Sequence, residues 1–203
     1  MALAAMSLHV TEQRGGLPVL AFRNGASFEE WLDHQPADAA GAWLKLPKKS
    51  ARTPRLTKSE AIDSALCYGW IDGQLDKYDE QYWLVRFTPR KARSKWSQVT
   101  RKRATELLVE GRMRKSGVAQ IDAAKADGRW DAAYAPASSA TVPADLQHAL
   151  DANPLAATFF ATLTGANRYA ILYRIGSVKR PETRARNIAA YVAMLERGET
   201  IHG

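Results

Sequence analysis

Residues 65–96 read ALCYGWIDGQLDKYDEQYWLVRFTPRKARSKW and join the end of one helix to the start of another. Between those helices, residues 70–78 and 81–88 are rich in aromatic and other β-favouring side chains. A polar pair separates the two segments, and Pro89 closes the second one. The pattern predicts a β-hairpin, and this hairpin organises the rest of the fold.

Side chains alternate between the two faces of a strand, so the second segment predicts one core face and one mixed face. The core face is expected to carry Trp83, Val85 and Phe87, and the other face Tyr82, Leu84, Arg86 and Thr88. We therefore predict buried side chains for Trp70, Trp83 and Phe87 and exposed ones for Arg90, Lys91 and Arg93.

Outward from the hairpin, residues 17–22 and 41–46 are short apolar runs that predict two further strands. Ser27 and Thr57 are each followed three residues later by a glutamate, the capping-box pattern of a helix start. Further helices are expected from Ser94 or Ser97 to about residue 110 and from 116 to 128.

The C-terminal third differs in composition from the rest of the chain. Residues 131–142 are rich in Ala, Ser and Pro without periodicity, which indicates a linker, and residues 143–203 have the proline starts and apolar spacing of successive helices. We expect a disordered leader (1–16), an α+β region (17–130), the linker and a helical region. The predicted fold is α+β: a small antiparallel sheet with packed helices, followed by a helical C-terminal subdomain.

The 203-residue chain is 46% hydrophobic and 25% charged, the composition of an ordinary globular protein. Its formal net charge of +8 favours an anionic partner, either a small acidic molecule or nucleic acid, although solubility alone would also account for it. Cys67 is the sole cysteine and is expected to be a small buried thiol, and no His/Cys spacing predicts a metal site. The sequence indicates no cofactor, transmembrane helix, signal peptide or particular protein partner, so a cytoplasmic location is expected.

Aromatic and charged residues gather around the hairpin as a mixed surface of the kind that binds ligands. Asp72 and Arg86 lie on neighbouring strands and could face one cavity, where arginine recognises a carboxylate or phosphate; an ordinary structural ion pair is the alternative. Unpaired N–H groups at the start of the helix after Ser94 or Ser97 would add to the attraction for an anion. The ligand-binding candidates are Trp70, Asp72, Arg86, Arg90, Ser94 and Trp96.

The stretch 90–103 has many basic residues and no acidic one, with Trp96 in its middle. Single-stranded nucleic acid is bound by such a combination of charges and an aromatic ring, although a solvated helix face has the same composition. The candidates for this alternative are Arg93, Lys95, Arg101, Lys102 and Arg103.

Two groups of motifs resemble a known bacterial family. ALCYGWIDG (65–73), RFTPRKARSKWS (86–97) and LLVEGRMRKSG (107–117), with LQHALDANPLAATFF (146–160) and YRIGSVKRPETRARNIAAYVAMLERGE (173–199), resemble the YdeI/OmpD-associated (OmdA, bacteriocin-protection) family. The resemblance covers about residues 17–200 and implies protection against antimicrobial peptides or envelope stress, with no catalytic residues to carry over. We expect a non-catalytic stress-protection or small-anion-binding protein; a nucleic-acid-binding module is the second hypothesis, and an uncharacterised enzyme using Asp72 and Arg86 is the third.

Overall fold

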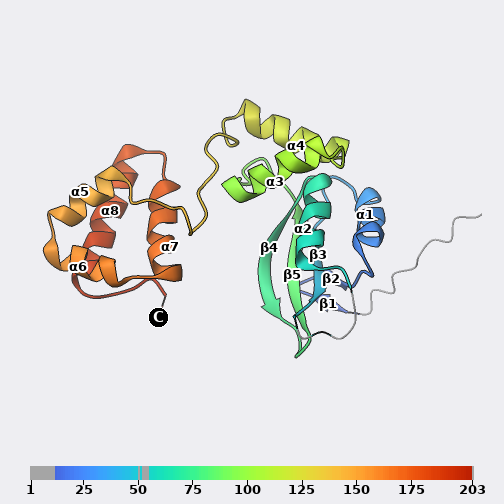
Figure 1. Ribbon diagram of the computed structural model, residues 1–203, viewed down its shortest axis with the longest axis horizontal. Helices are drawn as coiled ribbons and strands as arrows, with labels where there is room; N and C mark the ends of the chain where they lie inside the picture. The colour runs from blue at the N-terminus through green and yellow to red at the C-terminus, as the bar shows by residue number, and fades with distance from the viewer. Residues whose placement is uncertain (1–11, 50, 52–54, 203) are drawn as a thin grey trace, which may run out of the picture. The chain divides into compact units, whose positions relative to one another are not determined.

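The computed structural model describes residues 12–49, 51 and 55–202, which form a five-stranded sheet and eight helices (Figure 1). The chain divides into two compact units. The first contains the residues up to 94 together with 100–131, and the second contains 95–99 and 132–203. Most of the expected leader lies outside the described residues, but its residues Gln13–Arg14 form the first strand.

The first unit is built on a sheet with the strand order β1-β2-β3-β5-β4. The strands are β1 (Gln13–Arg14), β2 (Leu17–Leu20), β3 (Ala42–Pro47), β4 (Trp70–Lys77) and β5 (Tyr82–Pro89). The α+β class is confirmed, but the sheet is mixed rather than antiparallel throughout, because β2 and β3 pair in parallel. Helix α1 (Gly25–Asp33) connects these two strands, and such a crossover returns the chain in the same direction.

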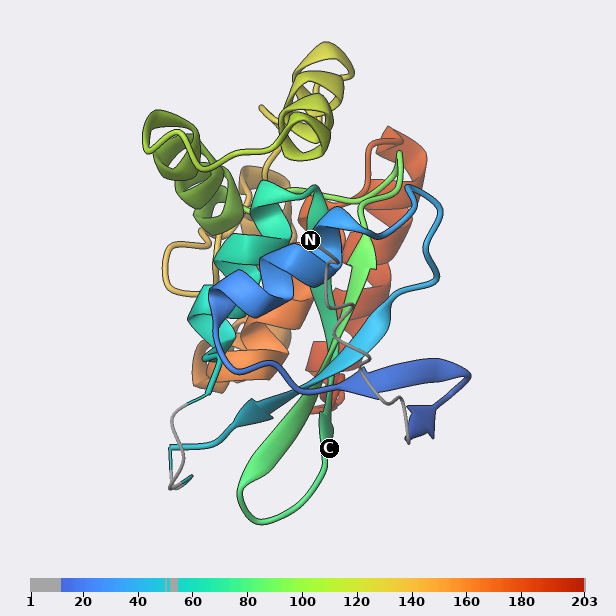
Figure 2. The same cartoon turned by 90° about the vertical axis from the view of Figure 1, so that its right-hand side faces the viewer.

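One face of the sheet is covered by α1 and by α2 (Lys58–Cys67), which lie together in Figure 2. The Phe28 ring lies 5.8 Å from the Phe87 ring, and the Trp31 ring lies 5.5 Å from the Trp70 ring. The predicted alternation along β5 is confirmed, since Phe87 and Val85 are buried on this face opposite residues of β3. Trp83, however, is only half-buried, with the Lys48 ammonium 4.4 Å above its ring.

The two predicted helix starts have different outcomes. Thr57 caps α2 in a capping box with Glu60, as predicted, and the hydrogen bonds from Thr57 lower the pKa of Glu60. For α1 the cap is Asn24, and Ser27 takes the third helical position, where its hydroxyl completes the capping box. An Asn accepts a backbone N–H as readily as a Ser, so the chain enters this helix three residues earlier than expected.

On the opposite face of the sheet, side chains from the strands themselves pack against one another. Arg14 on edge strand β1 forms an ion pair of 2.7 Å with Asp76 on the other edge strand, β4, so the sheet must curl. Leu17, Trp43 and Leu84 are buried inside this curl. Arg86 is paired with Trp43, so it lies on this same face of the sheet, two residues along β5 from Leu84.

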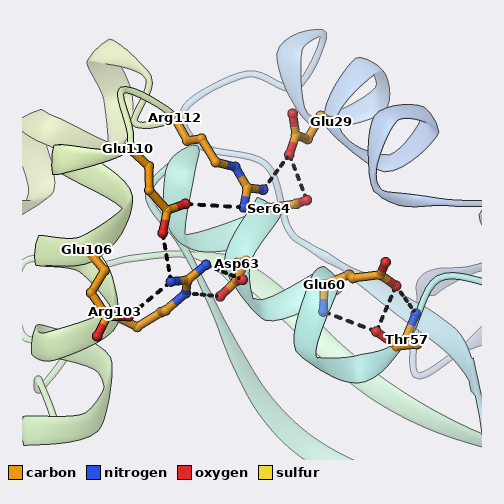
Figure 3. A network of polar contacts seen from close by, with 9 residues as sticks. All are labelled: Glu29, Thr57, Glu60, Asp63, Ser64, Arg103, Glu106, Glu110 and Arg112. Carbon is orange, nitrogen blue, oxygen red and sulfur yellow. Dashed lines mark hydrogen bonds and ion pairs between the residues drawn. The ribbon is translucent and has the colours of Figure 1, made fainter.

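A network of ion pairs connects α1, α2 and α3 (Gln98–Val109), as Figure 3 shows. Arg103 binds both carboxylate oxygens of Asp63 at 2.9 Å and also contacts Glu106 and Glu110. Arg112, just beyond α3, contacts Glu29, which accepts a hydrogen bond of 2.8 Å from the buried Ser64 hydroxyl. The network holds these helices together and so supports the start of the next helix, α4 (Lys115–Ala126).

The second unit is a helical cluster of α5 (Ala144–Asp151), α6 (Pro154–Thr162), α7 (Gly165–Gly176) and α8 (Pro181–Glu196). Its buried side chains include Leu146, Leu150, Phe160, Ile171, Ile175, Ile188 and Leu195. Residues 95–99 belong to this unit because Tyr134 exchanges backbone hydrogen bonds with Trp96 and Gln98. Proline begins α6 and α8 as expected, whereas Pro143 is the residue before α5 rather than its first residue.

Candidate functional site

Two neighbouring pockets of the first unit share the residues Ala37, Pro89 and Arg90. The larger, which we call the Arg114 pocket, has a volume of about 580 Å³. Its lining comes from the end of α1, residues 68–70, the end of β5 and the start of α4. The smaller, which we call the Arg86 pocket, has a volume of about 520 Å³. Its walls are residues 37–40, Gly73 and Gln74 of β4, and residues 86–91 without Phe87.

Arg90 is the side chain that links the two pockets. It is only 6% exposed, so the prediction that it would be exposed was wrong. The prediction placed Arg90 in an exposed basic turn after Pro89, whereas its N–H donates to the Gly69 carbonyl at 2.9 Å and the β4–β5 pairing continues to this residue. Gly69 itself adopts a φ of 77°, as expected of the residue that ends α2.

An aromatic wall borders the Arg114 pocket. Trp70 and Tyr68 line it and are 5% and 8% exposed. The Arg114 guanidinium lies 5.6 Å from the centre of the Tyr68 ring, within the range of a cation–π contact. Burial raises the pKa of Tyr68 and Arg114 opposes that rise, so the phenol stays neutral at physiological pH. The wall is thus apolar and uncharged beneath a cationic rim.

The start of α4 supplies the polar side of the same pocket. Arg114 is the N-cap residue and makes no side-chain capping hydrogen bond, so the first-turn N–H groups of α4 lack a side-chain acceptor. Lys115 and Ser116 of this turn line the pocket. The prediction assigned this role to the helix start near Ser94 or Ser97; in the structure it is the start of α4 that lies at the pocket.

Asp72 does not join Arg86. In the β4–β5 register Asp72 lies opposite Phe87, and directly paired residues share a face of the sheet. Asp72 is therefore on the face of α1 and α2, whereas Arg86 is on the face of its β3 partner, Trp43. The pair proposed from the sequence, whether as a ligand site or as a structural ion pair, is not formed.

The two remaining ligand candidates, Ser94 and Trp96, line neither pocket. The Ser94 hydroxyl accepts a hydrogen bond of 3.0 Å from the Lys91 N–H and so shapes the turn after β5. Trp96 is 1% exposed and belongs to the second unit. Of the six candidates, the structure brings Trp70 and Arg90 together in one pocket and Arg86 and Arg90 together in the other.

In the basic stretch proposed to bind nucleic acid, some side chains contact other parts of the protein and others are exposed to solvent. Arg103 is held by three carboxylates, and Arg101 donates to the Trp130 carbonyl at 3.0 Å. Lys95 belongs to the second unit and lies 4.9 Å from the centre of the Tyr173 ring. Arg93 and Lys102 are exposed. The stretch therefore does not present its charges as one continuous, unengaged face.

The cysteine thiol, possible metal ligands and possible membrane-spanning helices were the other features to consider. Cys67 is buried, which raises the pKa of its thiol to about 11. Within the described ranges, no group of three or more His, Cys, Asp or Glu side chains is placed to hold a metal ion. None of the described helices combines the length and apolar character that crossing a bilayer requires.

Sequence reasoning missed the contribution of α4. Arg114, Lys115 and Ser116 lie about 45 residues beyond Trp70, and no local pattern relates the two segments. The one signal was Gly117, whose missing side chain permits close approach: a Cβ there would lie 2.2 Å from the Cys67 carbonyl oxygen. That contact fixes the start of α4 against the end of α2, beside the pocket.

Two family models match the chain, each over one part of it. Residues 20–120 match "Domain of unknown function (DUF8412)", and residues 139–198 match "Bacteriocin-protection, YdeI or OmpD-Associated". Searches of curated proteins and of solved structures find no match to this chain. The match over residues 139–198 confirms the resemblance of this part of the chain to the YdeI/OmpD-associated (OmdA) family.

Proposed function

We propose that this chain is a non-catalytic binding protein for a small molecule with a carboxylate or phosphate group, and that the group binds in the Arg114 pocket. The observation that carries the proposal is the lining of this pocket, in which the buried Arg90 is joined by Arg114 and Lys115. Among the described lining residues, Asp33 is the one carboxylate against these three cations. An excess of positive charge in a concave, partly apolar site favours an anion.

The surroundings of Arg90 strengthen this inference. A guanidinium removed from bulk water interacts more strongly with an anion than an exposed one does, because less solvent screens the charge. The N–H groups at the start of α4 and its helix dipole favour negative charge at the same place. Trp70 and Tyr68 shield the pocket from water on the opposite side.

The lining groups of the pocket are suited to binding rather than to bond making. Most of its polar groups are guanidinium, ammonium and amide groups, with one carboxylate (Asp33) and one aliphatic hydroxyl (Ser116), and the nearby Cys67 is buried with a raised pKa. The family description names bacteriocin protection. We extend that protective role to this chain as a consequence of ligand binding.

The test is a titration of the ¹⁵N-labelled full chain with inorganic phosphate and, separately, with hexanoate, at low salt and followed by NMR. We expect the largest shifts at the amides of Ser116 and Gly117, at the start of α4. Lys115→Met should weaken binding about three- to tenfold by removing one cation from the rim. The matched control is Lys125→Met, which changes another exposed lysine of the same helix that lies outside the pocket, near the Trp130 ring, and this variant should bind normally.

Two results would overturn the proposal. One is the absence of saturable binding by both phosphate and hexanoate to the wild-type chain. The other is an equal loss of affinity in Lys115→Met and Lys125→Met, since that would show attraction to the net positive charge rather than binding in the pocket.

A further inference from the structure

The Arg86 pocket contains a buried hydrogen-bond donor that the fold leaves unused. The Nε atom of Arg86 is buried and, among the described residues, has no hydrogen-bond partner. Leaving such a donor unpaired costs free energy, so native proteins usually provide a partner for it. Arg86 lines the pocket, and an acceptor bound there would satisfy this donor.

Local strand geometry opens this pocket beside Arg86. The β4–β5 register shifts between Asp72 and Leu75, and the intervening Gly73 and Gln74 line the pocket instead of continuing the ladder. Such bulges are common next to functional sites because they interrupt pairing and redirect side chains. The pocket therefore adjoins an irregularity of the sheet, at the side chain of Arg86.

The charge in the Arg86 pocket also favours an anion. Arg86, Arg90 and Lys91 line it, and Asp38 is the one carboxylate among its described lining residues. The fork of N–H groups along one edge of a guanidinium, which includes Nε, matches the two oxygens of a carboxylate. Arg86 can therefore hold one anionic group while Arg114 and Lys115 hold another in the neighbouring pocket.

We propose that the ligand is an elongated molecule with an anionic group at each end, one bound in the Arg114 pocket and the other by Arg86. The inference rests on the proposed function and specifies its ligand class. The residues shared by the pockets support it: Ala37, Pro89 and Arg90 line both, and Ala37 and Pro89 offer an apolar wall to the segment between the two anionic groups. A short aliphatic chain fits that wall, and two linked anionic groups bind more tightly than one because the second is held near its site.

The experiment compares linear dicarboxylates, from succinate to suberate, with monocarboxylates of the same length, from butyrate to octanoate. Affinities for the full chain are measured by the same NMR titration. We expect one length of dicarboxylate to bind at least tenfold more tightly than its monocarboxylate. Arg86→Met should abolish this advantage, a loss of about tenfold for one charge-assisted contact, and bring the affinity of the dicarboxylate down to that of the monocarboxylate of the same length.

Two further variants keep the outcome decisive. Lys91→Met removes an exposed cation of the same pocket and should reduce the dicarboxylate advantage by about threefold. This variant tests the role of the Arg86 pocket if Arg86→Met fails to fold. Lys125→Met controls for overall charge.

The two proposals fail in different ways. If phosphate and monocarboxylates bind in a Lys115-dependent manner but no dicarboxylate binds more tightly, the two-ended ligand is refuted and the anion site stands. An advantage that survives both Arg86→Met and Lys91→Met, or that Lys125→Met reduces equally, also refutes it. If no anion binds at all, both proposals fall.

Discussion

Replacement of Gly117 by alanine tests how the start of α4 is fixed beside the Arg114 pocket. A Cβ at residue 117 would lie 2.2 Å from the carbonyl oxygen and 2.8 Å from the carbonyl carbon of Cys67. Both are backbone atoms at the end of α2, and the same oxygen accepts a hydrogen bond of 3.0 Å from the Arg114 N–H. The collision therefore cannot be relieved by a side-chain rotation, and α4 must move away from α2.

The expected magnitude follows from two opposing contributions. Overpacking of a close contact costs about 3 kcal/mol when backbone must shift. Alanine gains up to about 1 kcal/mol over glycine in a helix, and Gly117 lies in the first turn of α4. The net expectation for Gly117→Ala is a destabilisation of about 2 kcal/mol. The matched control is Gly25→Ala in α1, whose Cβ would meet the Ser64 hydroxyl at an ordinary 3.5 Å and which should be neutral or stabilising by about 0.5 kcal/mol.

Urea unfolding followed by tryptophan fluorescence measures both variants, because five of the six tryptophans (31, 43, 70, 83 and 130, but not 96) belong to the first unit. A loss of about 2 kcal/mol lowers the midpoint by about 1 M urea. The variant should also react faster with a thiol reagent, since Cys67 is buried with its pKa raised to about 11. If Gly117→Ala instead raised the midpoint as much as Gly25→Ala does, the contact between α2 and α4 would be disproved.

Two further predictions concern charge. Arg184 lowers the pKa of Asp145 through a bidentate ion pair between α8 and α5, so this carboxylate stabilises the second unit fully above its unfolded pKa of about 3.9 and progressively less as pH falls toward its folded pKa. In Asp145→Asn, the stability of the second unit should therefore depend less on pH below about pH 4, as measured by acid unfolding followed by circular dichroism. Acid unfolding identical to that of the wild-type chain would contradict this prediction. A double-mutant cycle of Arg103→Met with Asp63→Asn should give a coupling energy of about 1 kcal/mol in urea unfolding, because the pair is bidentate and partly shielded from solvent. A coupling energy near zero would show that this ion pair, the centre of the network in Figure 3, adds no stability.

Local patterns in the sequence were sufficient for much of the secondary structure. Thr57 and Glu60 formed the predicted capping box, and the alternation of residues 82–88 correctly separated Phe87 from Arg86. Such features depend on neighbours a few residues apart, through helix capping and the two-residue repeat of a strand. The same reasoning placed the start of α1 three residues late, because Asn24 and Ser27 are both competent caps and only the packed helix distinguishes them.

The sequence by itself thus determined the α+β class, the family resemblance and the importance of the segment around Trp70, Arg86 and Arg90. Tertiary structure decided which side chains meet. Asp72 was separated from Arg86 by strand register, which sequence spacing does not specify when a bulge intervenes. Lys115 reached the pocket because the close approach of α4 to the end of α2 joins segments almost fifty residues apart, and contacts at that separation are set by packing of the whole unit rather than by any local preference.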